Sequence, residues 1–358
     1  MAVNGLRAGI IGCGNMGRNH AEIYRDLPGV ELVAATDASV ARAKRLCADF
    51  DMVPLGLIDF FDSVDIVSIC TWPASHCELA LAALRAGKHV LCEKPPAMNA
   101  GEATKMKETA DKHHLVLTYG LLYRHAFQDL VDVVGQVGDP YKVTGTWLRL
   151  FGFPEWGPQG YRDSSGGAMT DLGVHVMDLA WYLLGCPEPT LLHAKAWNYK
   201  ARELHAGLVP EQSHAVDDSS YTFIQMDNGC STIVEVAYAS DMTADEHASI
   251  EIQGSRGKLV LPVPTTQTTA SSELWPKFYR FDGTVSSCST VHTGPRLIRE
   301  ALHDQLANFR DAVLGICSPL ITSAQAVTLQ RMLDLAQWSA RFGGPVTNIP
   351  RQEQELKL

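Results

Sequence analysis

Three residues of this 358-residue sequence have side chains suited to moving the proton of a hydroxyl group. Asp171 and His175 are four positions apart, so on a helix they would lie on one face, and Asp178 would share that face. Lys94 follows an apolar, strand-like run. An imidazole, with an unperturbed pKa of about 6.5, can take a proton at neutral pH, and an ammonium group can stabilise the resulting alkoxide. Lys94, Asp171 and His175 are therefore candidates for a catalytic site. The alternative is that His175 is an ordinary core residue and Lys94 a solvated one.

A second candidate site is the glycine-rich turn Gly12-Cys13-Gly14-Asn15-Met16-Gly17, which follows an apolar run and precedes a helical pattern. In this context the spacing G-x-G-x-x-G is typical of a dinucleotide site. Gly12 allows a tight turn, Gly14 lets the backbone approach a pyrophosphate, and Gly17 lets helix and strand pack closely. We predict cofactor contacts for Gly12 and for the four residues Gly14, Asn15, Met16 and Gly17. The alternative is a glycine-rich turn without a ligand.

Asp37 ends the second apolar run, 25 residues after Gly12. A carboxylate at this place accepts hydrogen bonds from the ribose hydroxyls and would repel a 2′-phosphate. No arginine is adjacent to Asp37, although Arg42 lies five residues further on. The sequence therefore favours NAD as the cofactor, with NADP possible. The alternative is that Asp37 only caps the helix expected to begin near Ser39.

The elements that would position these residues alternate along residues 6–120 between short apolar runs and helical patterns. The runs are rich in β-branched residues, which is typical of strands covered on both faces of a parallel sheet. They cover Leu6–Ile11, Val30–Ala35, Asp65–Cys70, Val90–Cys92 and Leu115–Thr118. The helical patterns cover Met16–Leu27, Ser39–Phe50, His76–Ala86 and Gly101–His113. We therefore predict an α/β protein whose residues 1–122 form a Rossmann domain with a parallel sheet and right-handed crossovers.

Residues 123–358 are predicted to form a second, α+β domain for substrate binding and oligomerisation. Strand-like alternation occurs at Tyr141–Leu150, Thr190–Tyr199, Tyr221–Met226, Ser231–Tyr238, Ser249–Gln253 and Lys258–Val263. The stretches 227–229 and 254–257 are typical hairpin turns. These features predict a large, open, mostly antiparallel sheet with helices on one face, completed by helices at Arg296–Leu314 and Ser323–Phe342. The other face would be uncovered in a monomer, so we expect a homodimer or homotetramer that pairs through this sheet.

Two further motifs, together with the glycine-rich turn, closely resemble the Gfo/Idh/MocA family of glucose-fructose oxidoreductase, inositol dehydrogenase and MocA. One is Cys92-Glu93-Lys94-Pro95-Pro96, and the other is the stretch Gly166–Leu179, which contains Asp171 and His175. The resemblance covers essentially the whole chain. It implies an N-terminal Rossmann domain, a C-terminal α/β domain, and oxidation or reduction of one carbon of a sugar, inositol or related polyol with NAD or NADP. It also implies a cis peptide bond before Pro95 that directs Lys94.

The resemblance implies further cofactor contacts. The stretch Thr71-Trp72-Pro73-Ala74-Ser75-His76 is similar to a family segment near the ribose and nicotinamide. It implies that Thr71, Trp72 and His76 contact the cofactor, although His76 could instead only begin the following helix. Glu93 can pair with the ribose or orient Lys94, and both residues are assigned to the cofactor site.

Candidate substrate contacts come from residues 149–171 and from one arginine just past the last strand expected in the Rossmann domain. That arginine, Arg124, matches one that the family often carries, although the proline usually found a few residues later is absent. Aromatic and charged residues also gather in the segment before the stretch that contains Asp171, as a polyol pocket requires. The alternative is that the aromatic residues fill the core between domains. The candidates are Arg124, Arg149, Trp156, Tyr161 and Asp171.

Composition excludes several other functions. Thirty Lys and Arg against forty Asp and Glu give a net charge of −10, which disfavours nucleic-acid binding. The sequence has no run of about 18 apolar residues, so we expect no membrane span, and the N-terminus lacks the pattern of a signal peptide. Nine cysteines without a Cys-x-x-Cys pair predict reduced thiols in the cytoplasm rather than disulfides or a metal site.

The leading hypothesis is an NAD(P)-dependent sugar or polyol dehydrogenase with a small-molecule substrate. His175 takes the hydroxyl proton, Lys94 supports the alkoxide, and Asp171 orients the imidazole or binds substrate. Two alternatives stay open. One is an NAD-dependent glycosidase that oxidises a ring hydroxyl transiently. The other is a non-catalytic NAD(P) sensor, in which the lysine or the Asp-x-x-x-His pair is expected to be lost, whereas both are present here.

Overall fold

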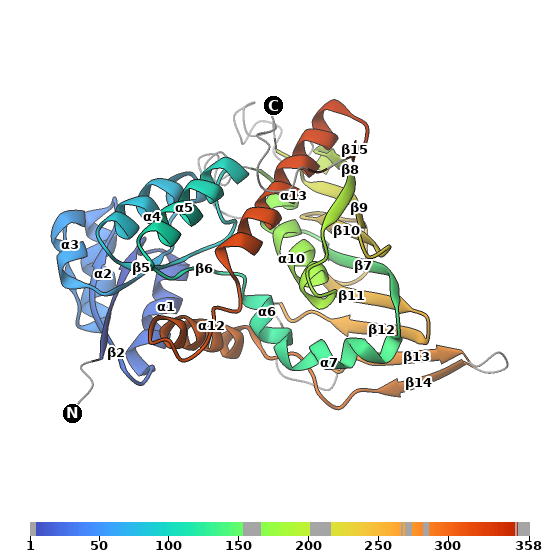
Figure 1. Ribbon diagram of the computed structural model, residues 1–358, viewed down its shortest axis with the longest axis horizontal. Coiled ribbons are helices and arrows are strands. Elements are labelled where there is room, and N and C mark those ends of the chain that lie inside the picture. The colour runs from blue at the N-terminus through green and yellow to red at the C-terminus, as the bar shows by residue number, and fades with distance from the viewer. Residues whose placement is uncertain are drawn as a thin grey trace. The chain divides into compact units, whose positions relative to one another are not determined.

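The computed structural model describes residues 5–152, 166–200, 216–265, 268, 274–281, 286–347 and 349. The chain divides into two compact units, whose elements are labelled in Figure 1. Unit 1 contains residues 1–125 and 298–330, and unit 2 contains residues 126–297 and 331–358. Among the described residues, no helix has both the length and the apolar surface that a bilayer crossing requires.

Unit 1 is built on a six-stranded parallel sheet with the strand order β3-β2-β1-β4-β5-β6. The strands are β1 (Leu6–Ile11), β2 (Val30–Thr36), β3 (Val53–Pro54), β4 (Ile66–Ile69), β5 (His89–Cys92) and β6 (Leu117–Tyr119). The helices between them are α1 (Asn15–Asp26), α2 (Val40–Phe50), α3 (Leu57–Ser63), α4 (His76–Arg85) and α5 (Ala100–Lys112). The strand order reverses between β1 and β4, and ligands of such sheets bind at the carboxyl ends of the strands beside this point.

The predicted Rossmann sheet is confirmed, and its central strands are buried as their apolar runs indicate. All four residues of β4 are buried, as are the last four of β1. β3 and α3 were not predicted. β3 has only two residues, both exposed, and it exists through backbone pairing with Ala34 and Ala35 rather than through an apolar pattern.

Helix α12 (Ile298–Val313) belongs to unit 1. The sequence pattern predicts it in the second domain, and that prediction is wrong. Its residues Leu302, Leu306 and Phe309 are buried in a core cluster with residues of α1, β1, β4 and β5. An amphipathic pattern shows that one face of a helix is buried but does not show against which sheet. Residues 298–330 thus belong to the same compact unit as the N-terminal residues. The predicted domain boundary between residues 122 and 123 would instead assign them to the second domain.

Unit 2 contains a nine-stranded sheet with the order β14-β13-β12-β11-β7-β10-β9-β8-β15. The strands are β7 (Pro140–Arg149), β8 (Pro189–Trp197), β9 (Ser219–Met226), β10 (Ser231–Ala237), β11 (Glu246–Gly254), β12 (Gly257–Pro262), β13 (Lys277–Phe281), β14 (Ser286–Thr290) and β15 (Val346–Thr347). β7 and β10 pair in parallel and the other neighbours pair antiparallel, so the mostly antiparallel sheet is confirmed. Both predicted hairpins are present, with Gly229 at a φ of +84° in the first. The three strands β13, β14 and β15 were not predicted.

One face of this sheet is covered by helix α10 (Gly173–Leu183), which packs on β7 and β10 (Figure 1). Gly145 of β7 makes room for it, since a Cβ there would lie 2.4 Å from Cγ1 of Val176. The opposite face carries exposed residues, with Tyr221 of β9 directly between Lys195 of β8 and Glu235 of β10. The remaining helices are α6 (Leu122–Phe127), α7 (Val131–Val134), α9 (Ala168–Asp171) and α13 (Ser323–Phe342), with short 3-10 turns η1 (Pro73–Ser75), η2 (Gln128–Leu130) and η3 (Gly135–Val137).

The placement of α12 can be tested by truncating one buried side chain. Phe309→Ala should lower the free energy of unfolding by about 3–5 kcal/mol, because it leaves a cavity in the core of unit 1. Urea denaturation followed by circular dichroism measures this change. As a control, Ile316→Ala, at a side chain 70% exposed, should change it by less than about 0.5 kcal/mol. Equal effects of the two variants would contradict the packing of α12 described above.

Candidate active site

The glycine-rich turn connects the carboxyl end of β1 to the start of α1. Gly12 has a φ of +97°, and a Cβ there would lie 2.7 Å from the carbonyl oxygen of Cys70. A Cβ on Gly17 would lie 2.0 Å from the carbonyl oxygen of Gly12. Neither position therefore accommodates a side chain. Gly14 differs, because nothing lies within 4 Å of its Cβ position.

Helix α1 begins with Asn15 and Met16 directly after Gly14. Among the described residues, no side chain caps this helix. The first N–H groups of a helix lack partners within the helix and, with the helix dipole, favour an anion. The open space at Gly14 and the uncapped start of α1 thus fit the phosphates of a dinucleotide.

Asp37 lies beside this turn, just after β2. Its carboxylate accepts hydrogen bonds from the backbone N–H groups of Cys13 and Ser39, both at 2.7 Å, and from Arg42 Nε at 3.2 Å. Burial, followed by the Asp37 charge, raises the pKa of the Cys13 thiol to about 12. Ser39, rather than Asp37, is the N-cap of α2. The Asp37 side chain is 7% exposed and that of Arg42 57%, so Arg42 presents the more accessible group beside the predicted ribose site.

The turn that carries Lys94 follows β5, and its Lys94–Pro95 peptide bond is cis, as the resemblance implies. The preceding Glu93 is buried. One oxygen of its carboxylate lies 3.1 Å from Nε2 of His20, and the other accepts the backbone N–H of Lys94 at 3.2 Å. Of the two roles considered for Glu93, this geometry favours the orientation of Lys94. The contact with His20 was not predicted, because a histidine on the buried face of an amphipathic helix has the pattern of a core residue.

His76 is buried at the start of α4 and links two loops. Its Nδ1 lies 3.0 Å from the carbonyl oxygen of Pro95, and its Nε2 lies 3.0 Å from that of Thr71. Burial lowers the pKa of the imidazole, although both carbonyl contacts raise it. The Thr71 hydroxyl accepts a hydrogen bond from Ser75 at 2.8 Å, and the Trp72 side chain is exposed. His76 does begin the helix, and cofactor contacts by Thr71, Trp72 and His76 stay predictions.

In unit 2, Asp171 and His175 lie on two consecutive helices. Asp171 is the last residue of α9 and His175 lies in the first turn of α10, so the prediction of a single helix is wrong. Leu172 separates the two helices, and its carbonyl accepts the backbone N–H of His175 at 3.1 Å in a tighter i to i+3 turn. Both side chains are 9% exposed. Asp178 is also buried.

Three residues that were not predicted hold the Asp171 and His175 side chains. The Tyr238 hydroxyl donates to Oδ2 of Asp171 at 3.1 Å. The ring of Trp147 lies beside the His175 imidazole, with 5.9 Å between centroids. Glu246 in turn accepts a hydrogen bond from Nε1 of Trp147 at 2.7 Å. These residues follow or belong to different strands, so no spacing in the sequence indicates that they meet.

Arg149 shares the Glu246 carboxylate, which its Nε contacts at 2.8 Å, and its Nη1 donates to the carbonyl of Gly152 at 3.2 Å. Burial raises the pKa of Glu246, but hydrogen bonds from Trp147, Arg149 and Thr265 together hold that pKa below its usual value. The Arg149 guanidinium is thus engaged in holding this cluster, and its contact with substrate stays a prediction.

The other candidate substrate contacts are placed differently. Arg124 is fully buried in unit 1, and its Nη1 donates to Oε1 of Gln325 at 2.9 Å. Trp156 and Tyr161 lie outside the described residues. Among the described residues, no group of three His, Cys, Asp or Glu side chains is arranged to hold a metal ion.

The start of α9 is held by Asp217, which was not predicted either. Its carboxylate accepts the backbone N–H of Met169 at 2.7 Å, and its own carbonyl accepts the N–H of Ala168 at 3.0 Å. A Cβ on Gly167 would lie 1.7 Å from this carbonyl oxygen, so glycine is required there. Asp217 therefore fixes the helix that ends with Asp171.

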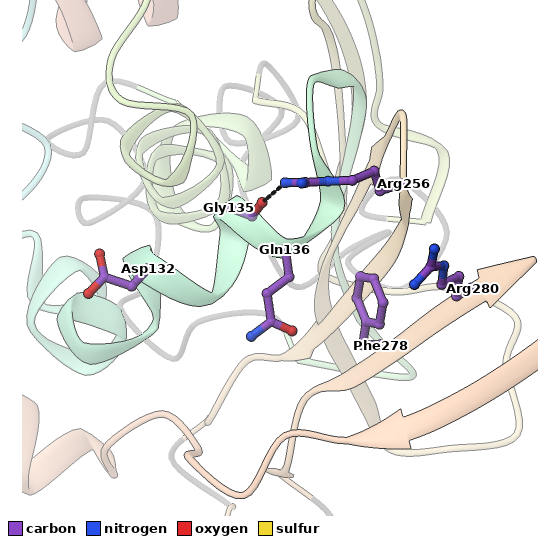
Figure 2. Close-up of a pocket in the computed structure, with 6 residues that line it drawn as sticks. All are labelled: Asp132, Gly135, Gln136, Arg256, Phe278 and Arg280. Carbon is purple, nitrogen blue, oxygen red and sulfur yellow. Dashed lines mark hydrogen bonds between the residues drawn. The ribbon is translucent and has the colours of Figure 1, made fainter.

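A cavity elsewhere in unit 2 contains none of the predicted site residues. It has a volume of about 460 Å³. Figure 2 shows its lining, in which Arg256 donates to the carbonyl of Gly135 at 2.7 Å. The lining residues come from α7, η3, the β11–β12 turn and β13: Asp132, Gly135, Gln136, Arg256, Phe278 and Arg280. Both arginines are exposed, and neither a histidine nor a lysine is among the lining residues.

Comparison with known proteins agrees with the two-part architecture. Residues 6–121 match a family model described as an oxidoreductase family with an NAD-binding Rossmann fold, and residues 127–260 match the GFO/IDH/MocA C-terminal domain. D-glucoside 3-dehydrogenase from Escherichia coli (strain K12) is 31% identical over 288 residues, which cover 76% of this chain and 82% of that protein.

Solved structures show the same fold. A levoglucosan dehydrogenase in complex with NADH and L-sorbose has a TM-score of 0.81 at 22% identity, covering 97% of this chain and 100% of the other. GenD2 from gentamicin A biosynthesis, in complex with NAD, has a TM-score of 0.78 at 23% identity and covers 97% of each chain. The Rossmann domain of unit 1 is therefore an NAD-binding domain, and the open start of α1 fits this cofactor.

The open space at Gly14 generates a test of cofactor binding. Gly14→Ala should keep the fold, because its φ of −83° suits alanine and no atom lies within 4 Å of the new methyl group. The methyl group should nevertheless block a close approach of phosphate, weakening NAD binding at least about tenfold. Isothermal titration calorimetry measures the binding. Gly56→Ala, which also introduces a methyl group into open space at a helix start, should leave NAD affinity unchanged. Equal affinities of the two variants would contradict the assignment of Gly14.

Proposed function

We propose that this chain, which belongs to the Gfo/Idh/MocA family of oxidoreductases, acts on a secondary hydroxyl of a sugar, inositol or glycoside. Its relative from Escherichia coli is named a D-glucoside 3-dehydrogenase, which supports a glucoside-like substrate. NAD is the cofactor, with NADP possible through Arg42. The observation that carries the proposal is the pair of buried, oriented side chains Asp171 and His175 in the second unit.

His175 is the proposed acid–base residue. The Trp147 ring beside it restricts the imidazole, and its low exposure limits competition from water. In the oxidising direction His175 takes the hydroxyl proton, and in the reducing direction it returns that proton. Asp171, held by Tyr238, orients the imidazole or accepts a hydrogen bond from a neighbouring substrate hydroxyl.

Lys94 is proposed to stabilise the alkoxide that forms as the proton leaves. Its backbone N–H is held by Glu93, which supports a fixed starting direction for its side chain. An ammonium group fixed in this way stabilises a developing negative charge without reorganising during the reaction. When bound, NAD supplies the acceptor for the hydride that leaves the substrate carbon.

His175→Asn and Lys94→Met should each lower kcat by about 10²–10⁴-fold, because each removes a group that acts on the hydroxyl in the transition state. NADH absorbance with a panel of glycosides, sugars and inositols measures the rate, and calorimetry should show unchanged NAD affinity for His175→Asn. Lys112→Met, at an exposed lysine of α5, is the control and should match the wild type.

Three outcomes would contradict this function. The wild type could reduce NAD with no member of the panel, the His175→Asn variant could keep full activity, or glycosides could be cleaved without accumulation of NADH. The last result would instead identify the glycosidase alternative.

We also propose that the chain forms a homodimer or homotetramer through the open face of the unit 2 sheet. Tyr221, which is 39% exposed, lies on this face between Lys195 and Glu235. An exposed aromatic residue flanked by opposite charges is suited to pairing with a second copy.

Tyr221→Arg should therefore dissociate the oligomer, because it places an extra charge in the middle of the proposed contact. Sedimentation velocity measures the change in mass. Val53→Arg, at a comparably exposed apolar residue of unit 1, is the control and should leave the mass unchanged. A wild-type protein that sediments as a monomer at all concentrations would contradict the proposed oligomer.

A further inference from the structure

We propose that His20 and Glu93 are positioning residues for Lys94, an inference that rests on the role of Lys94 proposed above. The His20 ring is fully buried on α1, and its Nε2 lies 3.1 Å from Oε1 of Glu93. Because a carboxylate only accepts hydrogen bonds, Nε2 is the donor. Nδ1 of His20 is buried without a hydrogen-bonding partner among the described residues, so the hydrogen bond of this ring is the one to Glu93.

The ring of His20 is also fixed by packing. Tyr24, one turn further along α1, meets it edge to face, with 6.4 Å between centroids and 79° between planes. Tyr24 is itself anchored by a hydrogen bond of 2.9 Å between its hydroxyl and that of Ser68 on β4. The imidazole therefore has one orientation in which to meet Glu93.

Packing and hydrogen bonds hold the Glu93 carboxylate and the backbone beside it. A Cβ on Gly120 would lie 2.4 Å from Oε1 of Glu93, so the carboxylate packs directly on the backbone there. The backbone N–H of Glu93 donates to Ile69 of β4 at 2.9 Å. The second carboxylate oxygen accepts the N–H of Lys94 at 3.2 Å. The Glu93 carboxylate thus links the His20 imidazole to the backbone nitrogen of Lys94.

The peptide group after Lys94 is held from the other side, where the carbonyl of Pro95 meets His76 at 3.0 Å. Without the His20 donor, the buried Glu93 carboxylate loses a partner and is free to rotate away from the Lys94 amide. A shift of about 1 Å in a catalytic group can cost about 100-fold in rate. Neither His20 nor Glu93 has to touch the substrate for this effect.

The first experiment compares two substitutions of His20. His20→Leu removes the donor to Glu93 and should lower kcat by about 100-fold, with little change in KM or in NAD affinity. His20→Gln keeps an N–H at the reach of Nε2 and should recover most of the loss. In a Lys94→Met background, His20→Leu should have no further effect, because both changes remove the same contribution. Additive losses, or equal rates of His20→Leu and His20→Gln, would overturn the proposal.

Ile23→Val is the matched control. It shortens a buried side chain of the same helix, in the core cluster with α12, and keeps both His20 and Tyr24, so it should leave kcat unchanged. A loss of kcat as large as that of His20→Leu would show a general effect of disturbing α1 and would overturn the proposal.

A second readout does not depend on activity. Reductive methylation with ¹³C-formaldehyde labels the lysines, and the resonance missing from Lys94→Met identifies Lys94. This resonance should shift in His20→Leu and return toward the wild-type position in His20→Gln.

If the wild type oxidises no sugar, the proposed function fails, and this resonance alone decides on the positioning role. If circular dichroism shows that His20→Leu does not fold, Glu93→Gln replaces it and should shift the same resonance. An unshifted resonance in the folded variant would overturn the proposal.

Discussion

Direct contact between backbone groups at the carboxyl ends of the unit 1 strands is the constraint on which the rest of this site depends. The carbonyl of Cys70, just after β4, occupies the space that a side chain on Gly12 would need, and the carbonyl of Gly12 does the same at Gly17. β1, the end of β4 and the start of α1 therefore touch with no side chain between them. The start of α1, where Gly14 and Asn15 are exposed, is left open for a ligand rather than capped by a described side chain.

The parts of the molecule governed by local pattern could be predicted from the sequence. Apolar runs gave the central strands of unit 1, and glycine spacing gave the dinucleotide turn because only glycine tolerates such close approach. The break at Leu172 could not be predicted, since a helical spacing of four is kept across it. His20 was missed for a related reason. Its position on α1 is that of a core residue, and only the path of β5 brings Glu93 to it.

The supporting residues of the second unit show a different limit. Trp147, Tyr238 and Glu246 lie on or next to β7, β10 and β11. In the sheet β7 lies between the other two strands, but it is far from both along the chain. Which side chains meet depends on the register of the paired strands, and the order of the residues along the chain does not give this register. The candidates chosen from the sequence were thus residues with charged or reactive side chains. The aromatic and acidic residues that hold them became visible only with the strand pairing.

Helix α12 also has a consequence for how the protein is made. The first 125 residues contain every strand of the parallel sheet, but the apolar surface formed by Ala8, Ile23 and Tyr24 is completed by Leu302, Leu306 and Phe309. On the ribosome, the N-terminal segment emerges with that surface uncovered. It stays so until the residues up to Phe309 of α12 have been synthesised. Exposed apolar surface of this kind on a nascent chain is a binding site for chaperones and a starting point for aggregation.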